Sequence, residues 1–295
     1  MISNIMDYEK TQYEGAQYPF LFVAPKEIDN LIVNYGITLP EKGSSEKIKK
    51  NVAKGVWNRD VLVDFCSEEV VKKCILICLS QYRTSDKNDE ESALGLYSKI
   101  LQIPYEQRFS ENGIQLIYQT LVKWNMNTRG AKLEDENPFI ESLYNNKTEI
   151  DKLSDYTVID FYNAARIKEI YEIVENLFKS LNLTKTSKFV TVSKTLHFLH
   201  PQLMVPMDRT YTANYFHNFS FPDVPREDKD QAKWNMEFHK ALCKVYHNHK
   251  DLFDKISFET RFPVTKLLDD ILIGFQLYRR FYCNQFDVSY IMCDK

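Results

Sequence analysis

The 295-residue sequence contains few of the residues that end regular secondary structure. It has 8 glycines and 10 prolines, and tight turns depend strongly on these two residue types. Apolar residues recur at three- and four-residue intervals in the segments 68–82, 91–100, 113–125, 160–181, 234–247 and 265–281. This spacing is typical of the buried face of a helix. The sequence therefore predicts a mainly α fold with long helices.

The chain also lacks the patterns of several common sites. Its six cysteines include no C-x-x-C pair, and Cys74 and Cys78, one helical turn apart in an apolar stretch, are predicted to be buried free thiols. No GxGxxG, GxxxxGK[ST] or GxSxG pattern occurs, which argues against the usual dinucleotide, NTP and hydrolase sites. His197 and His200 have no evident third ligand, so they predict core or pocket-wall residues, and neither a metal nor another cofactor is expected.

No apolar run is long enough to cross a bilayer, and the N-terminus lacks the pattern of a secretory signal. These absences predict no membrane partner and a cytoplasmic location. The charged segments 85–92 and 222–230 are too short for interdomain linkers. We expect one body with two helical lobes around a central cleft, in which residues 60–205 form the central lobe and residues 1–59 and 206–295 form the second.

Positive charge is concentrated locally, although the net charge is −3 and the pI is about 6.1. Two basic segments stand out, one with Lys47, Lys49, Lys50, Lys54 and Arg59 and one with Lys185, Lys188, Lys194 and Arg209. Such segments are typical of phosphate contacts, and equally of an ordinary solvated helix face. Nearby aromatic residues such as Trp124 and Tyr211 suit stacking on bases, although aromatic side chains more often belong to a core.

The segment from Ser193 to Thr212, SKTLHFLHPQLMVPMDRTYT, carries the most chemical information. Apolar residues within it predict a buried element, with Lys194 at its start and Asp208 just past Pro206. An amine and a carboxylate held in this way are candidates for nucleophile and catalytic carboxylate. The alternatives are an exposed lysine at a helix start and an aspartate that caps the next helix.

The pair of motifs Lys194-Thr195-Leu196 and Val205-Pro206-Met207-Asp208 resembles the signature of the helix-hairpin-helix base-excision DNA glycosylases. Two longer patterns, Trp124 to Lys132 and Ser193 to Thr212, are also similar to those of a group of bacterial proteins without an assigned activity. The sequence Thr191-Val192-Ser193 stands where the glycosylase hairpin has two glycines. The resemblance covers a small part of the chain.

The resemblance implies a helix-hairpin-helix glycosylase-like fold and a DNA glycosylase that flips out and excises a damaged or modified base, with or without lyase activity. Anti-phage defence is one role for such an enzyme. By position, Asp208 and Lys194 match the catalytic aspartate and lysine. For contacts with double-stranded DNA or the extruded base, the sequence offers Trp124, Asn125, Asn127, Arg129, Lys132, Ser193, His197, Arg209, Tyr211, Lys49 and Lys50.

A second class of function fits the same residues. A non-catalytic helical protein could use the cleft to bind nucleic acid or a protein partner. The segment from Trp124 to Lys132 illustrates the ambiguity, because it suits either base recognition or a helix end with a packed tryptophan.

Overall fold

The computed structural model describes residues 61–85, 91–124, 126, 132–217 and 222–282. Within these ranges the chain is mainly helical, which confirms the predicted fold class. The longer helices are α4 (Glu68–Ser85), α5 (Ala93–Gln102), α7 (Glu111–Lys123), α8 (Glu136–Asn145), α10 (Ala164–Ser180), α11 (Lys188–Leu199), α13 (Asp228–Asn248), α14 (Lys250–Thr260) and α15 (Val264–Tyr282). The shorter ones are α3 (Val61–Asp64), α6 (Tyr105–Arg108), α9 (Lys147–Asp151), η1 (Lys152–Asp155), η2 (Val158–Tyr162), the π-helical η3 (Arg209–Ala213) and α12 (Asn214–Phe216).

Polar side chains determine where several of these helices begin. Ser92 and Ser110 accept hydrogen bonds from backbone N–H groups of the first turns of α5 and α7. The predicted helix over 160–181 is wrong at its start, because Asn163 accepts bonds from the N–H groups of Ala165 and Arg166 and begins α10 there. The residues before Asn163 form the separate short helix η2.

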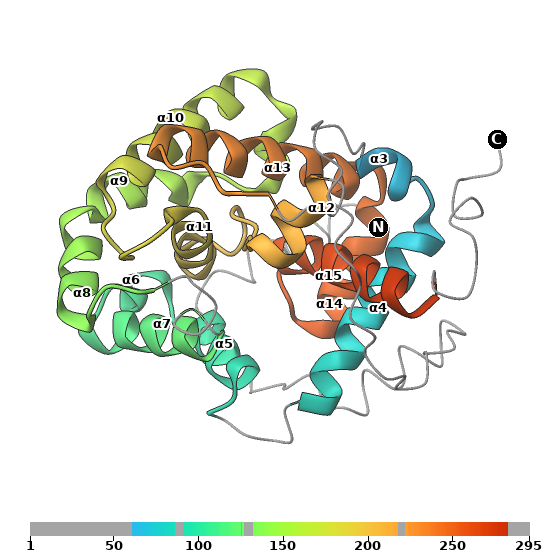
Figure 1. Ribbon diagram of the computed structural model, residues 1–295, viewed down its shortest axis with the longest axis horizontal. Coiled ribbons are helices and arrows are strands. Elements are labelled where there is room, and N and C mark those ends of the chain that lie inside the picture. The colour runs from blue at the N-terminus through green and yellow to red at the C-terminus, as the bar shows by residue number, and fades with distance from the viewer. Residues whose placement is uncertain (1–60, 86–90, 125, 127–131, 218–221, 283–295) are drawn as a thin grey trace, which may run out of the picture.

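Helix α11 lies between α13, which runs beside α10 at the top of Figure 1, and the helices α5 and α7 below it. Every residue from Thr191 to Leu199 is buried, and α11 contacts α5, α7 and α13. A helix enclosed on all sides shows no polar face in its sequence. Any functional group on α11 is therefore held in a rigid, packed setting.

The most extensive contact between two helices in the described chain joins α4 to α15. A Cβ atom added to Gly274 on α15 would lie 1.8 Å from the carbonyl oxygen of Cys74 on α4, so only glycine permits this approach. The predicted division places α4 in the central lobe (60–205) and α15 in the second, so this contact joins the two predicted lobes. Cys74 and Cys78 are buried free thiols, as predicted.

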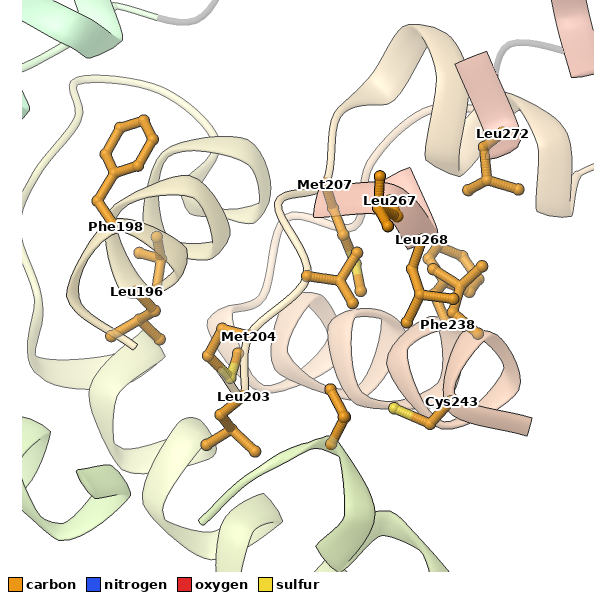
Figure 2. Close-up of a cluster of buried hydrophobic side chains, with 14 of the residues drawn as sticks. Leu196, Phe198, Leu203, Met204, Met207, Phe238, Cys243, Leu267, Leu268 and Leu272 are labelled. Atoms are coloured by element: carbon orange, nitrogen blue, oxygen red, sulfur yellow. The ribbon is translucent and has the colours of Figure 1, made fainter. Parts of the chain in front are cut away.

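A single hydrophobic core runs through the described chain. In Figure 2, the segment with Leu203, Met204 and Met207 passes between α11 and the helices α13 and α15. Met207 lies beside Leu267 and Leu268 of α15. The core therefore fixes the segment that leads to Asp208 against both neighbouring helices.

Candidate functional site

The backbone brings the two motifs of the sequence side by side. Ser193 is fully buried on α11, and its Oγ lies 3.2 Å from both the backbone nitrogen and the backbone oxygen of Met207. Met207 N–H donates to this hydroxyl. Lys194 and Asp208 each follow one residue later, so the two residues that carry the resemblance stand next to a contact between their segments. Ser193 itself has no exposed surface for a DNA contact.

Asp208 caps the short helix η3. Its Oδ1 accepts a hydrogen bond of 2.6 Å from the backbone N–H of Tyr211, and its own backbone N–H donates to Thr212 Oγ1 at 3.2 Å. The capping role considered from the sequence is thus correct. The Asp208 carboxylate is thus held by the backbone at the edge of the core. Its side chain is only half-buried, so it keeps contact with solvent. Capping and catalysis are compatible at such a residue.

Lys194 does not stand at the start of its helix, contrary to the sequence prediction. Helix α11 begins after Ser187, whose hydroxyl accepts from the N–H of Phe189, so Lys194 lies in its second turn. Only 9% of Lys194 is exposed. Its Nζ lies 5.2 Å from the centre of the Trp124 ring, within the range of a cation–π interaction.

Trp124 follows α7 and belongs to an aromatic cluster. Its ring centre lies 5.4 Å from that of Tyr97 and 4.9 Å from that of Phe198, and its Nε1–H donates to Ala93 O at 3.2 Å. The packed tryptophan considered from the sequence is therefore present, and the side chain is half-buried. A role in filling the gap of a flipped base stays a prediction.

His197 is a core residue. It is fully buried, with Nε2 2.7 Å from Tyr97 Oη and Nδ1 2.7 Å from Met204 O. Since a carbonyl only accepts, Nδ1 carries the proton and the Tyr97 hydroxyl donates to Nε2. Both ring nitrogens are occupied, so the predicted contact of His197 with a base has neither a free atom nor an exposed surface in this arrangement. His200 is buried as well.

The basic residues of the second segment mostly contact acids. Arg209 is exposed and lies 3.1 Å from Asp223, while Lys188 lies 2.8 Å from Asp228. An exposed ion pair of this kind contributes little stability and can exchange for a phosphate. Lys132 is exposed, and Tyr211 is half-buried with its carbonyl 2.6 Å from Gln276 Nε2. The remaining predicted contact residues lie outside the described part of the chain: Lys49, Lys50, Asn125, Asn127 and Arg129.

A buried ionic cluster on α15 was not predicted from the sequence. Lys266 Nζ lies 2.9 Å from Asp269 Oδ2 and also contacts Asp270 Oδ1. The Lys266 side chain is 4% exposed, and its Nζ lies 6.0 Å from the centre of the same Trp124 ring that Lys194 approaches. Burial opposes the charge of Lys266, but the two aspartates outweigh it and raise the pKa of Lys266 well above its usual value.

The cluster adjoins Asp208. Burial raises the pKa of Asp269 to about 6, and the negative charges of Asp270 and Asp208 add to this effect while Lys266 opposes it. The hydrogen bond from Gln276 to Tyr211 O ties α15 to the helix that Asp208 caps. Lys194 and Lys266 thus both approach the Trp124 ring, while Asp269 pairs with Lys266 and feels the charge of Asp208. The sequence signal was a group of charges, Lys266-Leu-Leu-Asp-Asp270, inside an apolar helix.

A shallow hollow of about 460 Å³ lies elsewhere, beside α10. Its lining includes Glu149, Lys152, Tyr156, Arg166 and Glu169, none of which was predicted from the sequence to have a functional role. Tyr156 Oη donates to Glu169, and Arg166 lies over the Tyr156 ring. These mutual contacts account for the side chains without a ligand.

Comparison of the chain with protein-family models, with curated proteins and with solved structures gives no match. None of the helices in the described ranges has both the length and the apolar character of a membrane span.

Proposed function

We propose that this protein is a DNA N-glycosylase, with a helix-hairpin-helix glycosylase-like arrangement, that flips out and excises a damaged or modified base. The observation that supports this most directly is the Ser193–Met207 junction, which sets Lys194 and Asp208 at adjacent positions of two fixed backbone segments. These are the two residues on which the resemblance of the sequence to the glycosylases depends.

Asp208 supplies the carboxylate that this reaction needs. Cleavage of an N-glycosidic bond develops positive charge on the deoxyribose, and a nearby carboxylate stabilises that charge. Asp208 is half-buried, and its hydrogen bond to the Tyr211 N–H fixes its orientation. A preorganised carboxylate of this kind stabilises the transition state without having to reorient during the reaction.

Lys194 is better placed to orient the DNA than to attack the sugar as a nucleophile. Its Nζ lies over the Trp124 ring and the residue is 9% exposed, so an attack on the anomeric carbon would require the amine to leave that ring. We therefore propose that water is the nucleophile, oriented or deprotonated by Asp208. Strand cleavage through a Schiff base on Lys194 is the alternative mechanism.

DNA is the proposed partner, and defence against phages with modified DNA is one proposed biological role of the activity. Arg209 and Lys132 are exposed on the described surface. If phosphates replace Asp223 as the partner of Arg209, duplex binding must weaken as salt increases, because each phosphate contact releases condensed counterions.

The experiment is a screen for base release. Purified protein is incubated with DNA from phages with ordinary and modified bases and with duplexes that contain uracil, hypoxanthine or 8-oxoguanine, and abasic sites are counted with an aldehyde-reactive probe. We expect abasic sites with the wild-type protein and none above background with Asp208→Asn. The exposed Asp251 on α14 gives a matched control, because Asp251→Asn also removes one carboxylate. DNA binding without base release from any substrate would favour the non-catalytic binding module.

A further inference from the structure

We propose that Asp269 is the general acid of the same site and protonates the departing base while Asp208 stabilises the sugar cation. This assignment rests on the proposed glycosylase function and adds a second catalytic carboxylate to it. Asp269 lies on α15, far from Asp208 in the sequence, and neither motif of the sequence includes it.

The geometry turns the Asp269 face of α15 toward the helix that Asp208 caps. Gln276 follows Asp269 by seven residues, about two helical turns, so the two side chains share one face of α15. Gln276 Nε2 donates a hydrogen bond of 2.6 Å to Tyr211 O in η3, and Asp208 caps η3. The Asp269 side chain is 10% exposed. A general acid at this position can protonate the base directly or through one water.

The titratable groups around Asp269 come from four parts of the chain. Lys266 and Asp270 lie on α15 itself, and Asp208 belongs to the segment before η3. From α5, the buried phenol of Tyr97 feels the charge of Asp269. From α4, the Cys78 thiol lies 3.2 Å from Asp270 Oδ1 and faces the same group. Lys266 is therefore shared by two carboxylates, and only one of them needs to be ionised to balance it.

The different surroundings of Asp269 and Asp208 suit two different catalytic roles. Burial, Asp270 and Asp208 raise the pKa of Asp269 to about 6, so a proton is available there near neutral pH. Asp208 is more exposed and accepts a backbone hydrogen bond. Two carboxyl groups whose environments differ in this way divide the roles of acid and charge stabiliser in glycoside hydrolysis.

The reaction balances without any further reactant. The bond between the anomeric carbon and the base nitrogen breaks, its electron pair goes to the base, and the Asp269 proton moves to the base. Water then adds to the anomeric carbon. The proton that this water loses passes by way of Asp208 to the Asp269 carboxylate, which restores the starting state. The products are the free base and an abasic deoxyribose.

The test is the pH dependence of the single-turnover rate on the best DNA from the base-release screen. With wild-type protein the rate should fall about tenfold per pH unit between about pH 6.5 and about pH 8.5. Asp269→Asn should lower the rate at about pH 6.5 by about 100- to 1,000-fold and remove this decline, whereas Asp269→Glu keeps an acid and should retain it. Asp270→Asn removes a charge that raises the pKa of Asp269, so the decline should begin at lower pH.

The outcomes separate this assignment from the function on which it rests. Suppose that the wild-type protein releases base and Asp208→Asn does not. If Asp269→Asn then keeps the wild-type rate and pH profile, Asp269 is not the general acid, but the proposed glycosylase function is still supported. If Asp269→Asn folds normally by circular dichroism and only loses rate at every pH equally, Asp269 has a structural role and the assignment is also wrong. If the wild-type protein releases no base from any DNA, both the proposed glycosylase function and the role of Asp269 as its general acid are wrong.

Discussion

Acid should unfold this protein at unusually mild pH, because three histidines are buried in their neutral form. His197, His200 and His239 are each fully buried. Burial lowers the pKa of each of them from 6.5 to about 3. The lowered values mean that the unfolded chain binds protons that the folded chain does not. The stability linked to these residues is therefore present above about pH 6.5 and is lost as the pH falls toward 3.

The expected loss can be estimated for two conditions. Between about pH 7.5 and about pH 5.5, each histidine should cost about 1.4 kcal/mol of unfolding free energy, and the three together about 4 kcal/mol. Asp269 acts in the opposite direction, because its pKa is raised to about 6 and the folded state gains a proton; this returns about 1 kcal/mol. The net loss of about 3 kcal/mol is a large part of the usual 5–15 kcal/mol of a folded domain.

Urea unfolding, followed by circular dichroism at several pH values, measures this effect. His239 is stacked on Phe161 with ring centres 4.3 Å apart, and His239→Gln removes one titrating group from the core. Below about pH 5.5 this variant should show a slope of stability against pH that is smaller by about 1.4 kcal/mol per unit. The exposed His247 on α13 provides the control variant His247→Gln. Equal unfolding midpoints at about pH 7.5 and about pH 5.5 would refute the reasoning.

Two further variants test the packing and the mechanism. Gly274→Ala should destabilise the protein by about 2 kcal/mol despite the better helix propensity of alanine, because its Cβ would meet Cys74 O at 1.8 Å; an unchanged thermal midpoint would contradict this contact. Borohydride should trap no covalent adduct between the wild-type protein and DNA, because Lys194 Nζ is held over the Trp124 ring and water is the proposed nucleophile. A strong adduct that Lys194→Ala cannot form would instead establish the Schiff-base mechanism.

The sequence predicted most of the longer helices because their apolar residues follow the helical period. It also offered a helix cap as one of two roles for Asp208, since capping depends on residues close together in the chain. It misplaced Lys194 within its helix, because α11 is buried on all sides and no polar face marks its register. Only the packing of α5, α7 and α13 around α11 makes a lysine in that position a buried residue.

The α15 cluster shows a different limit of prediction. Lys266 and Asp270 are four residues apart, and in a sequence this spacing usually indicates an exposed ion pair. Their burial results from α4 and from Trp124, which are distant in the chain. A charged group within a continuous apolar helix is the local signal that could have revealed it. Its relation to Asp208 depends on tertiary contacts that no local pattern contains.

The most direct test of the proposed function is the single-turnover rate of base release by Asp208→Asn, measured together with its affinity for the same DNA. Asparagine keeps the size of the side chain and an oxygen that can cap η3, but it removes the negative charge. If Asp208 stabilises the sugar cation, the rate should fall by about three orders of magnitude or more, while the affinity and the thermal midpoint stay close to those of the wild-type protein. A well-folded Asp208→Asn variant that releases base at nearly the wild-type rate would contradict it.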